Sequence, residues 1–135
     1  MRAAVVSKIK AALPYLLLCG AGSSATFGFA PFTFWWLPLC SLTALTFLLQ
    51  RTQSTKTALL AGFSFGLGWF GAGISWVHVS IDQFGGLPLA GSLGLMLLLV
   101  AYLALFPALA SWLSVKLTNR AFWPVLFAAS WTLTE

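Results

Sequence analysis

Long apolar runs separated by short polar breaks are the feature that most constrains this chain. A helix needs about 20 mostly apolar residues to cross the roughly 30 Å hydrocarbon core of a bilayer, because it rises about 1.5 Å per residue. Four runs approach or exceed that length, over residues 11–28, 32–49, 58–81 and 89–114. We therefore predict four transmembrane helices. A fifth run, over residues 122–135, is too short to cross, and we interpret it as the start of a helix that continues in a longer protein.

The composition excludes a water-soluble fold. Hydrophobic residues make up 60% of the chain, charged residues only 7%, and the mean hydropathy is +0.95. A soluble domain has about 25% charged residues, which cover the surface that it cannot bury. Lipid must replace water as the solvent here. The sequence thus predicts an all-α protein, a multi-pass bundle of transmembrane helices.

The basic residues indicate how the bundle is oriented. The net charge of +5 comes from seven Lys and Arg, and all seven lie in breaks between apolar runs and not among aromatic residues, which argues against a nucleic-acid partner. Lys and Arg are retained on the cytoplasmic side of a membrane. A cytoplasmic N-terminus places every basic residue inside and leaves Asp82 outside. The basic residues are Arg2, Lys8, Lys10, Arg51, Lys56, Lys116 and Arg120.

A cleaved signal peptide over the first 30 residues is a less favoured alternative. Its lipoprotein form would use Cys19, but Leu18 stands where such signals have a small residue, and cleavage would remove the basic tail. Cys19 and Cys40 both lie inside apolar runs without a His or carboxylate at ligand spacing. We predict neither a disulfide nor a metal site, and expect two buried thiols.

Glycines are concentrated in the third run. Gly62 and Gly66 have the spacing that allows two helices to approach closely in lipid, and Gly73 continues the glycine-rich stretch. We predict helix packing as their role. Homodimerisation is the alternative, so the oligomeric state remains open.

Ser75, His78 and Asp82 would share one face of a continuous helix, and superficially they resemble a catalytic triad. Side chains stacked on one helix do not converge, and no oxyanion donor is evident, so we interpret them as a polar cluster at the membrane boundary. Trp76 suits the aromatic belt at that boundary. The segment Phe84, Gly85, Gly86, Leu87 and Pro88 is either a plain connector or a loop that meets lipid or substrate.

The stretch GFSFGLGWFGAGISWVHVSIDQFGGLP, residues 62–88, resembles the N-terminal membrane region of apolipoprotein N-acyltransferases. Other segments agree in order: FAP at residues 29–31, AYLALFPAL at 101–109 and WTLTE at 131–135. The resemblance covers nearly the whole chain, and residues 71–88 are its most specific part.

The resemblance implies an enzyme of the bacterial inner membrane. It would transfer an acyl chain from a membrane phospholipid to the N-terminal diacylglyceryl cysteine of an apolipoprotein, without a cofactor. The family carries its Glu, Lys and Cys set in a periplasmic nitrilase-like domain, which this chain lacks, and neither Cys19 nor Cys40 matches that cysteine. No catalytic residue is therefore predicted here, and the chain alone is expected to be inactive.

The resemblance also suggests a substrate-facing edge. We predict that Trp76, His78, Phe84, Gly85, Gly86 and Pro88 form it at the outer membrane face, where they help guide the two lipid substrates. His78 stands where similar proteins often have Tyr, which argues against a catalytic role for it. Two alternatives remain: a subunit of a small transporter or channel, and an inactive truncated product. A transporter is weakened by the scarcity of ionisable residues between 58 and 114.

Overall fold

The structure is a computed structural model that describes residues 2–29, 32–86, 88–117 and 123–134. Within these residues every regular element is a helix, so the all-α prediction is confirmed. The elements are α1 (Arg2–Ala25), the 3₁₀ turn η1 (Thr26–Gly28), α2 (Trp36–Arg51), α3 (Thr55–Gly73), α4 (Val77–Gly85), α5 (Leu89–Lys116) and α6 (Trp123–Thr134).

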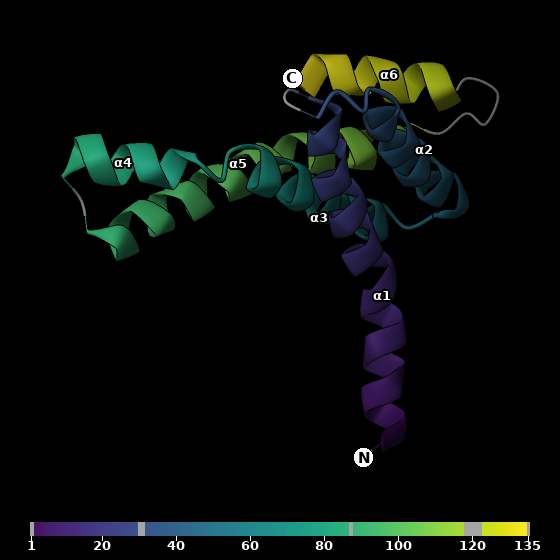
Figure 1. Ribbon diagram of the computed structural model, residues 1–135. Coiled ribbons are helices and arrows are strands. Elements are labelled where there is room, and N and C mark those ends of the chain that lie inside the picture. The colour runs from purple at the N-terminus through teal and green to yellow at the C-terminus, as the bar shows by residue number, and fades with distance from the viewer. Residues whose placement is uncertain (1, 30–31, 87, 118–122, 135) are drawn as a thin grey trace.

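Helix α3 lies at the centre of the molecule, between α1 and α5 (Figure 1). It runs beside α5, whereas α1 crosses this pair and its N-terminal half extends away from the other helices. The buried core joins α1, α2, α3 and α6 through large apolar side chains such as Leu18, Leu45, Phe65 and Phe127. The packing is therefore built around α3 from both sides.

Glycines bring α3 into backbone contact with both neighbours. A Cβ atom added at Gly66 would lie 2.8 Å from the Cα atom of Ala104 on α5, and one added at Gly62 would collide with the Pro107 carbonyl oxygen. On the opposite side, a Cβ at Gly68 would collide with the Cys19 backbone of α1. Helices in lipid associate through such close packing, because burial from water does not drive them together. Gly73 differs, since a Cβ there would meet only Thr26 at an ordinary 3.6 Å.

Hydroxyl groups link α5 to α6. The Ser114 and Ser130 oxygens are 2.8 Å apart, and each hydroxyl is also within hydrogen-bond distance of the Ala110 carbonyl oxygen. Ser111 is fully buried one turn away, and its hydroxyl has no hydrogen-bond partner among the described residues. Small hydroxyl side chains are therefore buried where α5 contacts its neighbours.

By length and composition, the described part of the chain contains one helix able to cross a membrane, α5, with 28 residues and a mean hydropathy of 2.4. Helices α3 and α4 pass the same test only as a pair, which is bent by 55°. Helix α2 has only 16 residues. The four-span bundle is thus not confirmed and stays a prediction. The fourth predicted run corresponds closely to α5.

The structure differs from the sequence expectations in three places. The continuous helix over residues 58–81 is broken, because α3 ends at Gly73 and α4 begins at Val77. The second helix begins at Trp36, four residues later than expected, after a turn in which Thr33 has a φ of 56°. Cys40 is exposed on α2 and not buried. Ala30 and Pro31, which belong to the FAP segment of the family resemblance, lie outside the described residues, as does Arg120.

Candidate lipid-facing edge around α4

Helix α4 is a short helix that lies between the glycine-rich end of α3 and a glycine cap at Gly86. It follows the glycine-rich end of α3, leaves it at 55°, and packs against α5. Its C-terminal cap is Gly86, whose φ of 63° lies in the left-handed region that glycine adopts without strain. Pro88 then precedes α5, in an extended conformation that suits the residue before a helix. The sequence thus folds residues 77–85 into an arm that reverses onto α5.

Large aromatic side chains are exposed on this arm. Phe84 is 88% exposed and Trp76 is 63% exposed, while Val77 and Ile81 are half-buried. Exposed rings of this size are unfavourable in water but favourable at a lipid boundary, where Trp is enriched. Two of the six residues predicted for a substrate-facing edge are therefore prominent on the surface, and Gly85, Gly86 and Pro88 are exposed beside them.

The structure does not assemble Ser75, His78 and Asp82 into a triad. Ser75 lies in the break between α3 and α4, and its hydroxyl donates to the Ala72 carbonyl oxygen at 3.1 Å. His78 Nδ1 contacts the Ser75 carbonyl oxygen and not the hydroxyl. Asp82 is exposed further along α4. With no hydrogen bond between a nucleophile and a base, the trio has no arrangement for nucleophilic catalysis.

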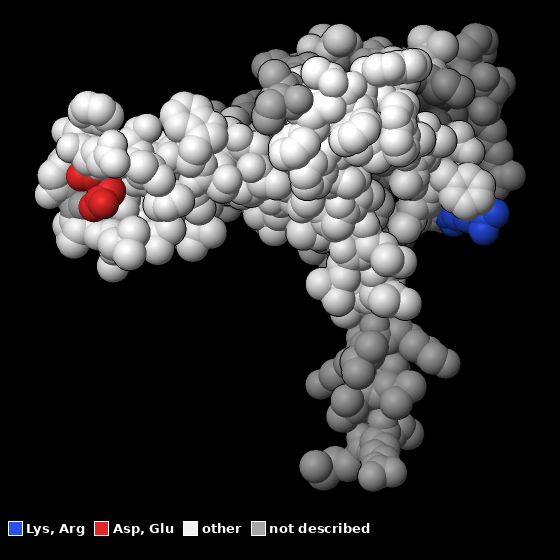
Figure 2. Space-filling view, in the orientation of Figure 1, with Lys and Arg blue, Asp and Glu red and all other residues white. Residues whose placement is uncertain are grey.

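Among the described residues in view, acidic and basic side chains are far apart. In Figure 2 the acidic atoms lie on the α4 arm, and the basic atoms in view lie at the far end. Arg51 is the last residue of α2 and Lys116 the last residue of α5, whereas Lys56 lies in the first turn of α3. Arg51 stacks over Phe47 at 4.1 Å and Lys116 over Trp112 at 4.4 Å.

Among the described residues, no three His, Cys, Asp or Glu side chains lie close enough together to hold a metal ion. Cys19 and Cys40 are free thiols. The arm can therefore offer apolar and aromatic contacts to a ligand, but this part of the chain presents no reactive group arranged for catalysis.

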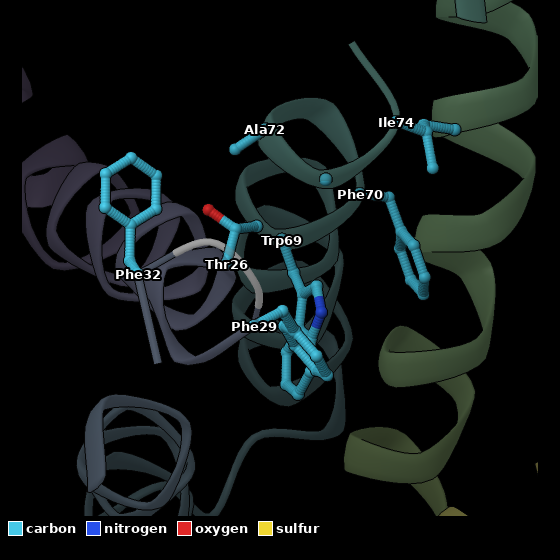
Figure 3. Close-up of a pocket in the computed structure, with 8 residues that line it drawn as sticks. Thr26, Phe29, Phe32, Trp69, Phe70, Ala72 and Ile74 are labelled. Atoms are coloured by element: carbon cyan, nitrogen blue, oxygen red, sulfur yellow. The ribbon is translucent and has the colours of Figure 1, made fainter. Parts of the chain in front are cut away.

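Sequence reasoning missed a second feature, a cavity of about 420 Å³ between η1 and the C-terminal end of α3 (Figure 3). It is lined by Thr26, Phe29, Phe32, Trp69, Phe70, Ala72, Gly73 and Ile74. The available signal was the aromatic residues beside the break at residues 29–31, together with Trp69 and Phe70 in the third apolar run. Only tertiary contact between η1 and α3 turns that concentration into one site.

The described residues are apolar and helical, with glycine-packed helices and an exposed aromatic arm, as expected of a helical membrane protein. Comparison with known sequences identifies the family. Residues 21–135 match the apolipoprotein N-acyltransferase N-terminal domain. The chain belongs to the apolipoprotein N-acyltransferase family, and it corresponds to the N-terminal part of that enzyme.

Relatives of known name agree with this assignment. The chain is 49% identical to the apolipoprotein N-acyltransferase of Vibrio cholerae over 110 residues, which are 79% of this chain and 22% of that protein. It is 40% identical to the enzyme of Shewanella oneidensis over 139 residues, covering 96% of this chain and 25% of that protein. For Photobacterium profundum the identity is 54% over 93 residues, covering 69% and 18%. The chain thus spans about a quarter or less of the length of these relatives.

Proposed function

We propose that this chain is the membrane-anchoring N-terminal part of an enzyme that N-acylates lipoproteins. The enzyme transfers an acyl chain from a membrane phospholipid to the N-terminal diacylglyceryl cysteine of an apolipoprotein. The observation that carries this proposal is the family match over residues 21–135. The transporter alternative is not favoured, because the family match and the relatives of known name all point to an acyltransferase.

The role of these 135 residues is anchoring and substrate guidance, not chemistry. Their two cysteines lie within α1 and α2, and no carboxylate or histidine cluster accompanies them in the described residues. The family resemblance implies a catalytic Glu, Lys and Cys set, and we infer that it belongs to the part of the relatives that this chain does not match. We therefore expect the 135 residues expressed alone to have no acyltransferase activity.

Four crossings of the inner membrane with a cytoplasmic N-terminus complete the proposal. The ends of α2 and α5 and the start of α3 carry Arg51, Lys116 and Lys56, whereas Asp82 lies on the α4 arm. This separation supports a cytoplasmic position for the basic ends and a periplasmic position for the arm. Trp76, His78, Phe84, Gly85, Gly86 and Pro88 then form the edge at which lipid substrates approach the catalytic part.

Two experiments test the proposal. Depletion of the intact protein in its source bacterium should leave lipoproteins lighter by one acyl chain in mass spectra, and unchanged masses would refute the enzymatic assignment.

Single cysteines at Gln83 and Gln53 test the orientation. A membrane-impermeant thiol reagent added to whole cells should label position 83 but not position 53, and the reverse labelling would overturn the topology.

A further inference from the structure

The break between α3 and α4 is held by hydrogen bonds that span three residues. The Val77 N–H donates to the Ile74 carbonyl oxygen at 3.0 Å, and the Val79 N–H donates to the Trp76 carbonyl oxygen at 3.1 Å. In a continuous α-helix each N–H reaches four residues back, so Val79 would donate to Ser75. The break therefore removes the helical donor of the Ser75 carbonyl oxygen.

The His78 side chain takes the place of that donor, because its Nδ1 atom contacts the Ser75 carbonyl oxygen. A carbonyl oxygen can only accept, so this hydrogen bond requires the proton of His78 to be on Nδ1. Three residues earlier, the Ser75 hydroxyl donates to the Ala72 carbonyl oxygen at 3.1 Å, in the last turn of α3. Two side chains thus supply donors that the interrupted helix lacks.

These donors matter because the surroundings of the break are apolar. Trp76 and Val79 are exposed beside it, and Ile74 and Val77 are half-buried. In an apolar medium water does not replace a missing donor, and an unpaired carbonyl group is costly. The contact from His78 therefore stabilises the bent form, in which the backbone itself leaves one carbonyl oxygen without a donor.

We propose that His78 is a positioning residue, which acts through the Ser75 carbonyl oxygen to hold the 55° bend between α3 and α4. Trp76 lies within the segment that this contact closes, so the contact also holds the backbone from which the exposed Trp76 ring projects. His78 then contributes to the edge without touching a substrate. The inference rests on the proposed function of the arm, since it assigns the orientation of α4 a role in acylation.

Amide hydrogen exchange of the full-length protein in detergent tests this contact without a substrate. His78→Leu removes the donor, and exchange across residues 74–79 should become about fivefold faster, as expected for the loss of one ordinary hydrogen bond. His78→Asn should exchange as the wild type does, because its amide nitrogen is bonded to Cγ, as Nδ1 is in His. His78→Gln places its nitrogen one bond further out and should behave as His78→Leu does. Helix propensity alone predicts the opposite order, since Gln is the better helix former of the two amides.

Gln83→Leu is the matched control, because Gln83 is exposed on α4 beyond the break. It should exchange as the wild type does across residues 74–79. Equal exchange in the wild type and His78→Leu would overturn the proposal. Exchange in His78→Asn as fast as in His78→Leu would overturn it too, because the effect would then not depend on a donor at the position of Nδ1.

Lipoprotein acylation by the same variants tests the consequence for the proposed function. The kcat/KM for an acceptor lipopeptide should fall about fivefold in His78→Leu, and His78→Asn should recover most of that loss. Equal kcat/KM values for the wild type and His78→Leu would refute the positioning role. Absence of acylation by the wild type would instead refute the proposed function, while the exchange comparison would still decide whether His78 holds the break. Circular dichroism checks that each variant is folded.

Discussion

The centre of α3 and the α4 arm use glycine and aromatic residues in opposite ways. In α3, Gly62, Gly66 and Gly68 remove side chains so that two helix backbones can touch it. On the arm, Gly86 permits a reversal of the backbone, while Trp76 and Phe84 project away from the protein. Within residues 62–86, glycines therefore serve first the close packing of α3 and then the backbone reversal at the exposed arm. The difference predicts that substitutions in α3 affect stability, whereas substitutions on the arm affect function.

The largest expected effect is at the core. In the full-length protein, Gly62→Leu should lower the free energy of unfolding by roughly 1–3 kcal/mol or more, because its side chain would collide with the Pro107 backbone of α5. Thermal unfolding in detergent measures this. Gly94→Leu is the matched control, since a Cβ at Gly94 meets no atom within 4 Å. Equal melting temperatures for the two variants would contradict the central role of α3.

The second prediction concerns the arm. Phe84→Ala should leave the melting temperature of the full-length protein unchanged, because the ring is 88% exposed. Burying a Phe side chain against a ligand contributes roughly 1.5–3 kcal/mol, so lipoprotein acylation should fall about tenfold or more. The rate is measured by mass spectrometry of an acceptor lipopeptide. Leu98→Ala, at a position 68% exposed on α5, should retain wild-type activity. Equal acylation rates for the two variants would show that the Phe84 ring on the arm does not help to guide substrates.

A smaller effect is expected where the arm reverses. Gly86→Ala places a Cβ on a residue with a φ of 63°, which costs about 1 kcal/mol. Amide hydrogen exchange across residues 77–85 should become faster, because the α4 cap is strained. Gly85→Ala, where a Cβ would meet Ile81 at an ordinary 3.6 Å, should exchange as the wild type does. Faster exchange in Gly85→Ala alone would show that the reversal does not depend on Gly86.

The smallest expected effect is between α5 and α6. Ser130→Ala removes the contact between the Ser114 and Ser130 hydroxyls and should destabilise the full-length protein by about 0.6 kcal/mol, as is typical for such bonds in membranes. Thr132→Ala is the comparison, because the Thr132 hydroxyl donates within α6, to the Ala128 and Ala129 carbonyl oxygens. A larger loss for Thr132→Ala would contradict a stabilising link between α5 and α6.

Apolar run length predicted α5 well, because residues 89–114 are mostly apolar and carry no charge, and α5 covers Leu89–Lys116. The polar break around residues 50–57 was also informative, since Ser54 caps α3 by accepting from the Thr57 N–H. The break at Ile74 was not predictable in the same way. Hydropathy is continuous across it, and glycine both permits close packing and weakens a helix. The predicted edge residues remain a proposal, while the cavity was not found from the sequence.

Composition and the apolar runs by themselves predicted a lipid environment and an all-helical class. The stretch at residues 62–88 carried the family resemblance. These properties depend on local chemistry summed along the chain. Tertiary structure decided that α3 lies between α1 and α5, that the third run bends at Ile74, and that Phe29 meets Trp69 across a cavity. Those features depend on contacts between residues far apart in sequence, and a one-dimensional pattern of apolar residues does not specify which helix faces which.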